Sequence, residues 1–215
     1  MPGYSLVLFD LDGTLTDSKV GMTKSVQYAL VKLGIAPPSQ DDLTPIIGPP
    51  LHVTFRERYG LPPATVSQAI AYYREYFLAR GMYENQLYPG VLKLLQQLAA
   101  APQYRIVATA KPTVFAERIL DHFGIRSFFD HVVGSNLDGT RSAKTDVIAH
   151  SLGQYPGIGR AVMVGDRQHD VIGAHDNTID SIGVTYGYGS ITELTAANPT
   201  YMVNTVAEIG RIVEP

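Results

Sequence analysis

The chain has 215 residues, of which 45% are hydrophobic and 17% are charged, and it carries a formal net charge of −3. This length is sufficient to bury a sizeable core and indicates one large or two small domains. The slightly acidic balance, without a block of Lys or Arg, argues against binding to nucleic acid or to an anionic membrane, and the absence of cysteine excludes disulfides, thiolate catalysis and cysteine-bound zinc.

The first predicted element is a strand over Tyr4–Phe9, a short apolar run of the kind that lies buried in a parallel sheet. Asp10 and Asp12 follow it, at a spacing that places both side chains on one face of an extended chain. Gly13 then allows a sharp turn and a close approach of the backbone to a ligand. Carboxylates at the end of a buried strand need a metal, a proton or a cationic partner. One of the two can attack a phosphoryl group while the other moves protons at the leaving oxygen, although Asp and Gly also shape simple turns.

The next segment predicts helices. Lys19–Leu33 places its apolar residues on one helical face, and Leu51–Tyr59 and Pro62–Arg80 are two further helical stretches. No convincing strand-like alternation occurs within residues 16–87. We therefore predict an all-helical cap domain over this range, inserted directly after the first strand.

Strands and helices alternate after the insert, which is typical of a parallel sheet covered by helices. The predicted strands are Arg105–Thr109, Phe129–Val133, Ala161–Val164 and Ser181–Thr185. The predicted helices are Gly90–Ala101, Thr113–Phe123, Ser142–Leu152, Val171–Asn177 and Ile191–Ala197, and Tyr201–Val203 with Val206–Val213 closes the chain. The predicted fold is α/β, with a Rossmann-like parallel-sheet core (residues 1–15 and 88–215) that has helices on both faces.

Ligands of such sheets bind beyond the carboxyl ends of the strands. The second predicted strand ends at Thr109, whose hydroxyl can bind a phosphate oxygen together with the backbone N–H of Ala110, although Thr109 also suits an N-cap or an ordinary strand position. With Ser142 as N-cap, Lys144 falls in the first turn of the next helix, where the helix dipole disfavours a cation. A lysine there is less unusual if an anion lies beside it, and a solvated surface lysine is the alternative.

A further strand delivers Asp166, and Asp170 follows four residues later as a helix begins. Together with Asp10 and Asp12 these residues gather carboxylates that would repel one another without a cation. Oxygen ligands without cysteine point to Mg²⁺. His169 is adjacent, but a single histidine without a partner favours a surface or structural position over a ligand.

Residues 9–18 resemble motif one of the haloacid dehalogenase-like hydrolases, and Thr109, Lys144 and Asp166 with Asp170 come in the order and separation of the other three motifs of that family. The resemblance covers nearly the whole chain, including the helical insert. It is strongest toward the phosphoglycolate phosphatase-like branch and its members described as 5′-nucleotidases. The stretches that resemble this branch are Leu87–Gly90, Gly165–Arg167, Gly173–Ala174 and Gly183–Ser190.

The resemblance implies an aspartyl-phosphate mechanism. Asp10 would be the nucleophile, and Asp12 would be the acid for the leaving alcohol and then the base for water. Thr109 and Lys144 would hold the phosphoryl oxygens, and Lys144 would also offset the charge of Asp10. Because dehalogenase members lack the second aspartate of motif one, Asp12 argues against dehalogenation.

The same resemblance implies a magnesium site. Asp10, Asp166 and the backbone carbonyl of Asp12 would bind Mg²⁺, with Asp170 in support. The expected cofactor is therefore Mg²⁺.

The helical insert matches the cap that closes over the site in this family. Candidate substrate contacts are Gly48, His52, Arg56 and Lys111, although His52 and Arg56 equally suit an ordinary helix surface. The aromatic residues within 72–77 recur at helical spacing, which favours a place in the core of the cap over a platform for stacking bases.

We predict a magnesium-dependent phosphomonoester hydrolase that acts on a small phosphorylated metabolite, such as a nucleoside monophosphate or phosphoglycolate. Nucleotides rank slightly ahead because of the match at Tyr186–Ser190. The alternatives are a phosphosugar mutase and a non-catalytic regulatory protein of the same fold, and Asp12 argues against the latter. The expected partner is the small phosphate ester, without nucleic acid or membrane, for a monomer or homodimer. The absence of a basic N-terminal region and of an apolar segment of spanning length predicts a cytoplasmic protein.

Overall fold

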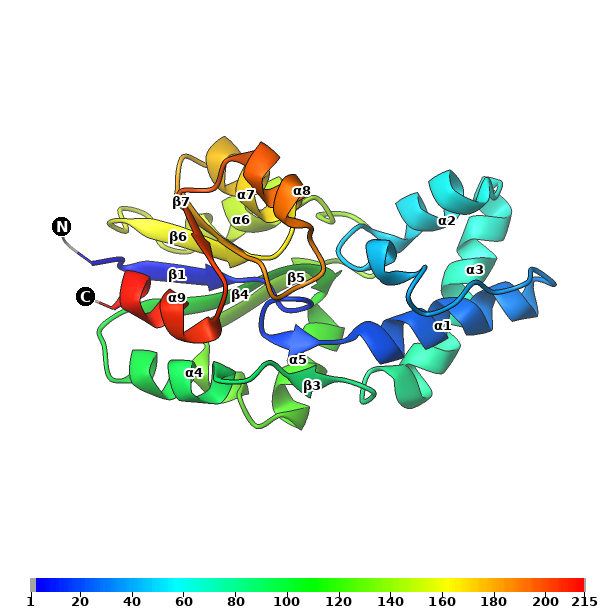
Figure 1. Ribbon diagram of the computed structural model, residues 1–215, viewed down its shortest axis with the longest axis horizontal. Coiled ribbons are helices and arrows are strands. Elements are labelled where there is room, and N and C mark those ends of the chain that lie inside the picture. Colours follow the sequence, from blue (N-terminus) through cyan, green and yellow to red (C-terminus); the bar gives the residue numbers. More distant parts are fainter. Residues whose placement is uncertain (1–2, 215) are drawn as a thin grey trace. The chain divides into compact units, whose positions relative to one another are not determined.

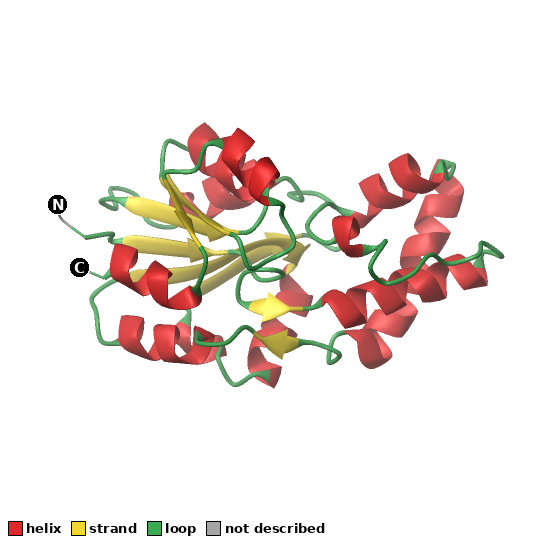
Figure 2. Ribbon diagram, in the orientation of Figure 1, coloured by secondary structure: helices red, strands yellow, loops and turns green. Residues whose placement is uncertain are grey.

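The computed structural model describes residues 3–214, drawn as ribbons in Figures 1 and 2. The chain divides into two compact units. The core unit comprises Met1–Thr16 and Leu87–Pro215, and the helical unit comprises Asp17–Gln86. Within the described range, no helix combines the length and the apolar character needed to cross a membrane.

A parallel sheet organises the core unit, and its described strands follow the order β5-β4-β1-β6-β7-β8 (Figure 2). The strands are β1 (Leu6–Phe9), β4 (Tyr104–Pro112), β5 (His131–Ser135), β6 (Ala161–Gly165), β7 (Asp180–Val184) and β8 (Tyr201–Val203). All four side chains of β1 are buried, because a central parallel strand is covered on both faces and an apolar run suits both. Leu6 and Leu8 share one core cluster with Ile106 of β4 and Met163 of β6.

Helices cover the two faces of this sheet in two groups. They are α4 (Val91–Ala99), α5 (Thr113–His122), α6 (Lys144–Gly153), α7 (Gln168–Asp176), α8 (Ile191–Ala197) and α9 (Val206–Val213), with the 3₁₀ turn η3 (Arg126–Phe128). Helix α7 packs against α6 and α8, whereas α4 packs against α9 (Figure 1). The predicted Rossmann-like α/β core is confirmed. The strand predicted over Phe129–Val133 begins later, at His131, because the N–H of Phe129 closes the 3₁₀ turn by donating to the carbonyl of Arg126 at 3.1 Å.

The helical unit consists of α1 (Lys19–Lys32), the 3₁₀ turn η1 (Thr44–Ile46), α2 (Leu51–Tyr59), α3 (Pro63–Tyr76) and the π-helical turn η2 (Phe77–Gly81). The single helix predicted over Pro62–Arg80 is therefore wrong in its last turn, where the hydrogen-bond pattern changes. Tyr73 and Phe77 are buried and stack at 5.4 Å between ring centroids, so the prediction of an aromatic core is confirmed for these two residues. Tyr72 and Tyr76 are only half-buried.

Two very short strands are not predicted from the sequence. β2 (Thr16–Asp17) and β3 (Gln86–Leu87) pair with each other where the chain leaves the core unit and where it returns to it. A strand of two residues contains no alternation that a periodicity argument can detect.

Candidate active site

Neighbouring strands bring the predicted site residues to one edge of the sheet. Asp10 directly follows β1, Asp166 directly follows β6, and Thr109 lies in the last part of β4. Because these strands are adjacent and parallel, their carboxyl ends meet. Lys144 is the first residue of α6, and Asp170 lies in the first turn of α7. The two side chains form an ion pair with each other at this edge.

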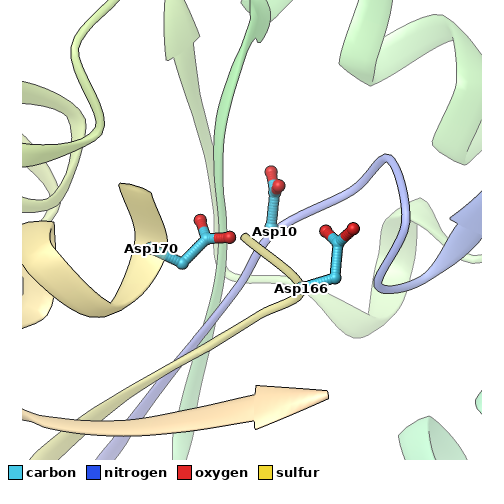
Figure 3. A group of neighbouring side chains, drawn as sticks. All are labelled: Asp10, Asp166 and Asp170. Carbon is cyan, nitrogen blue, oxygen red and sulfur yellow. The ribbon is translucent and has the colours of Figure 1, made fainter. Parts of the chain in front are cut away.

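Three buried carboxylates form a tight group, here called the carboxylate cluster. Asp10, Asp166 and Asp170 are 5%, 0% and 1% exposed, and one oxygen of each lies within 4.8 Å of the others. Figure 3 shows the three carboxyl groups side by side. Burial raises the pKa of Asp166 well above its ordinary value, and the charges of Asp170 and Asp10 raise it further. Burial likewise raises the pKa of Asp170 to about 6 against the opposing charge of Lys144. The cluster therefore needs positive charge to remain ionised near neutral pH.

The charges of the site fit a divalent cation. When ionised, the carboxylate cluster and Asp12 carry four negative charges, and the two buried lysines at this edge, Lys111 and Lys144, carry two positive ones. The difference is two negative charges. The donors are all carboxylate oxygens, which are the ligands that Mg²⁺ prefers. The residues present thus fit a bound Mg²⁺.

Lys144 links two members of the cluster. Its Nζ lies 2.8 Å from Asp10 Oδ1 and 2.8 Å from Asp170 Oδ1, and it donates to the carbonyl of Ala108 at 3.1 Å. Burial alone would lower the pKa of Lys144, but the two carboxylates outweigh burial and raise it. The alternative of a solvated surface lysine is therefore wrong. The predicted N-cap Ser142 is also wrong, since Ala143 occupies that position and Lys144 is the first helical residue.

Asp12 lies outside the carboxylate cluster and forms an ion pair with a second lysine, Lys111. Its Oδ2 is 2.9 Å from Nζ of Lys111, and the two side chains are only 9% and 5% exposed. The other oxygen, Asp12 Oδ1, is buried and has no hydrogen-bond partner among the described residues. The sequence predicts Lys111 only as a possible substrate contact and contains no signal for its pairing with Asp12.

Thr109 is buried at the end of β4, at 2% exposure. Its hydroxyl accepts a hydrogen bond from the backbone N–H of Lys111 at 3.2 Å. The pairing of β4 with β5 shifts register between Ala108 and Pro112, an irregularity that re-aims side chains beside functional sites. Ala110 is half-buried in this segment. The binding of a phosphate by Thr109 and Ala110 stays a prediction.

Glycines make room for Asp166. A Cβ at Gly13, whose φ is +87°, would lie 2.2 Å from Asp166 Oδ2, and a Cβ at Gly187 or Gly189 would lie 2.3 Å from Asp166 Cβ or 1.9 Å from its carbonyl oxygen. Between these last two glycines, the backbone N–H of Tyr188 donates to Asp166 Oδ2 at 2.7 Å. A larger residue at Gly13 or Gly187 would displace the side chain of Asp166, and one at Gly189 would displace its backbone. In the sequence, the alternating glycines of this stretch are the signal for such a close approach.

A tyrosine ties the same loop to the loop after β1. The hydroxyl of Tyr186 donates to the carbonyl of Thr14 at 2.9 Å, and the centroid of its ring lies 4.9 Å from the ring centroid of Tyr88. The hydroxyl of Thr14 is also 3.4 Å from Asp166 Oδ1. The loop after β1, which carries Asp10, is thus bonded both to the loop after β7 and to the side chain of Asp166.

The remaining predicted contacts lie elsewhere in the chain. Gly48, His52 and Arg56 belong to the helical unit, where Arg56 is exposed and pairs with the neighbouring Glu57 at 3.0 Å. Their contact with a substrate stays a prediction. His169 is exposed, which agrees with the surface position that the sequence favours, and it lies outside the carboxylate cluster.

Comparison with known proteins identifies the family. The profile described as haloacid dehalogenase-like hydrolase matches residues 7–184. The chain therefore belongs to the haloacid dehalogenase-like hydrolases, and within them to the phosphoric monoester hydrolases. The predicted resemblance and enzyme class are both confirmed.

Individual relatives cover almost the whole chain. It is 43% identical to the 5′-nucleotidase of Pseudomonas aeruginosa over 98% of this chain and 96% of that protein. It is 47% identical to the tyrosine-protein kinase PtkA of Mycobacterium tuberculosis over 87% of this chain and 65% of that protein. The crystal structure of a predicted phosphatase from Clostridium acetobutylicum superimposes with a TM-score of 0.93 at 48% identity and covers 98% of both chains.

Proposed function

We propose that this phosphatase hydrolyses a small phosphorylated metabolite by way of an aspartyl-phosphate on Asp10, with Mg²⁺ as cofactor. The observation that carries the proposal is the pairing of Asp10 with Lys144 inside a buried group of carboxylates. A carboxylate held beside an ammonium group can approach an anionic phosphate that would otherwise repel it. Asp10, Asp166 and the carbonyl of Asp12 would hold Mg²⁺, with Asp170 in support, and the ion would supply charge stabilisation at the phosphoryl oxygens.

The first step forms a bond between an oxygen of Asp10 and phosphorus while the bond from phosphorus to the ester oxygen breaks. Asp12 gives its proton to the leaving alcohol. Lys144, Thr109 and the N–H of Ala110 would bind the equatorial oxygens, whose charge develops in the transition state.

The second step releases the enzyme. The oxygen of a water molecule attacks phosphorus, the bond to Asp10 breaks, and Asp12 takes the proton of that water. The products are an alcohol and inorganic phosphate, and Asp12 ends in its starting protonation state.

We further propose that the helical unit acts as a cap that limits substrates to small molecules. The chain enters this unit directly after the loop that carries Asp10 and Asp12 and leaves it at Gln86. The relative named 5′-nucleotidase and the stretch Tyr186–Ser190 favour nucleoside monophosphates over phosphoglycolate. The cytoplasmic location and the monomeric or homodimeric state stay predictions.

A screen of phosphate esters tests this function. The panel contains nucleoside 5′-monophosphates, phosphoglycolate, sugar phosphates and a folded phosphoprotein, each with Mg²⁺ and with excess chelator. We expect release of inorganic phosphate from at least one metabolite, only with Mg²⁺, and none from the phosphoprotein. Comparable rates on the phosphoprotein would contradict the cap, and isomerised sugar phosphate in place of inorganic phosphate would identify a mutase.

The similarity to PtkA supports a second candidate, transfer of a phosphoryl group to a protein tyrosine. In that reaction the acceptor hydroxyl of tyrosine takes the place of water in the second step. Incubation with ATP and a tyrosine-containing protein distinguishes the two. We expect no phosphotyrosine, and its Asp10-dependent appearance would favour the kinase reaction.

A further inference from the structure

We propose that Lys111 is a positioning residue that holds the Asp12 carboxylate in place for proton transfer. This inference rests on the proposed function, in which Asp12 is the acid and base. The site then has two lysines with separate tasks. Lys144 holds the nucleophile Asp10, and Lys111 holds Asp12.

The backbone around Lys111 is fixed on both sides. Its N–H donates to the hydroxyl of Thr109 at 3.2 Å. On the other side, a Cβ at Gly134 of β5 would lie only 2.2 Å from the carbonyl oxygen of Lys111 and 2.8 Å from the nitrogen of Thr113, so the two segments are in close backbone contact. The N–H of Gly134 also donates to the hydroxyl of Thr113 at 2.9 Å. The irregular end of β4 is thus held close to β5 at Lys111, the residue whose side chain contacts Asp12.

The ion pair with Lys111 involves only one of the two carboxylate oxygens of Asp12. Oδ2 is held by Nζ of Lys111 at 2.9 Å, whereas Oδ1 has no hydrogen-bond partner among the described residues. A buried carboxylate with one oxygen anchored has a defined orientation, which leaves Oδ1 as the oxygen that exchanges a proton with the leaving group or water. Loss of the ammonium group would leave the carboxylate buried and without a cation, and therefore free to turn or to take another partner.

A role through Asp12 predicts a specific dependence on the leaving group. The value of kcat/KM covers the steps up to departure of the leaving group, and an alkoxide needs a proton at that point whereas p-nitrophenolate does not. Lys111→Met is expected to lower kcat/KM for a nucleoside 5′-monophosphate by about 10²-fold, and for p-nitrophenyl phosphate by less than about tenfold. Lys111→Arg retains the charge and should recover most of the loss.

A double-mutant cycle separates this role from direct contact of Lys111 with the substrate. Asp12→Asn should show the same leaving-group dependence as Lys111→Met, with a loss of about 10²–10⁴ on the alkyl ester. Adding Lys111→Met to Asp12→Asn should then cost almost nothing further. Lys93→Met, at an exposed lysine of α4, is the matched control and should leave both substrates unaffected.

The outcomes distinguish a failure of the proposed function from a failure of the inference about Lys111. If Asp12→Asn affects both substrates equally, the proposed function is wrong in its proton-transfer step. Two results would overturn the inference even if Asp12→Asn is selective for the alkyl ester. Lys111→Met could lower kcat/KM equally for both substrates, or it could lower kcat/KM as strongly in the Asp12→Asn background as in the wild type. Either result would mean that Lys111 acts on the substrate. Circular dichroism and thermal melting check the fold of each variant, and Lys111→Gln replaces the Met variant if that one does not fold.

Discussion

Replacing Asp10 with asparagine is expected to lower phosphate release by a factor of about 10³ or more, because an amide cannot form the aspartyl-phosphate. The fold should survive. The substitution retains the shape of the side chain and removes one negative charge from a crowded cluster, and Lys144 keeps its second partner, Asp170, at 2.8 Å. Initial rates of phosphate release and thermal melting curves measure the two effects.

Asp121→Asn is the matched control for this experiment, because Asp121 is exposed on α5, away from the strand ends that form the site. It should leave the rate unchanged. Near-normal phosphate release by the Asp10→Asn enzyme would show that the nucleophile lies elsewhere.

Removal of Mg²⁺ is expected to abolish turnover and to lower the melting temperature. The site holds two more negative than positive charges when all its groups are ionised, so a bound dication stabilises the folded state as well as the reaction. By mass action this stabilisation is about 2.7 kcal/mol when the ion is present at 100 times its dissociation constant. Melting curves in excess chelator and across a Mg²⁺ series measure it without any substrate.

Asp166→Asn sharpens this prediction. The amide oxygen can still accept the N–H of Tyr188, but it lacks the charge that the cation requires. The variant should lose both the activity and most of the Mg²⁺-dependent rise in melting temperature, whereas Asp121→Asn should retain both. An unchanged rise in Asp166→Asn would mean that the cation binds at another site.

The parts of the site that follow directly from buried strands were predicted from the sequence. Asp10 and Asp166 each come immediately after an apolar run, and adjacency of parallel strands is enough to bring their side chains together. Lys144 was predicted for the right reason, since a cation in the first turn of a helix needs an anion beside it.

Contacts set by irregular backbone could not be predicted. The pairing of Lys111 with Asp12 depends on the register shift at the end of β4, and no periodicity in the sequence reports such a shift. The approach of Gly187 and Gly189 to Asp166 depends on two loops that meet only in the folded sheet. The start of α6 at Lys144 likewise depends on tertiary ion pairs that outweigh the N-cap preference of Ser142.

The stereochemical course at phosphorus tests the central claim, that Asp10 carries the phosphoryl group between substrate and water. The substrate is a phosphorothioate ester made chiral at phosphorus with ¹⁷O and ¹⁸O, hydrolysed in ordinary water by the wild-type enzyme with Mg²⁺, so that the released thiophosphate carries sulfur and three different oxygen isotopes. Two successive in-line displacements, first by Asp10 and then by water, each invert the configuration, so the released thiophosphate should show net retention. Net inversion would mean that water attacks the substrate directly and that Asp10 forms no bond to phosphorus.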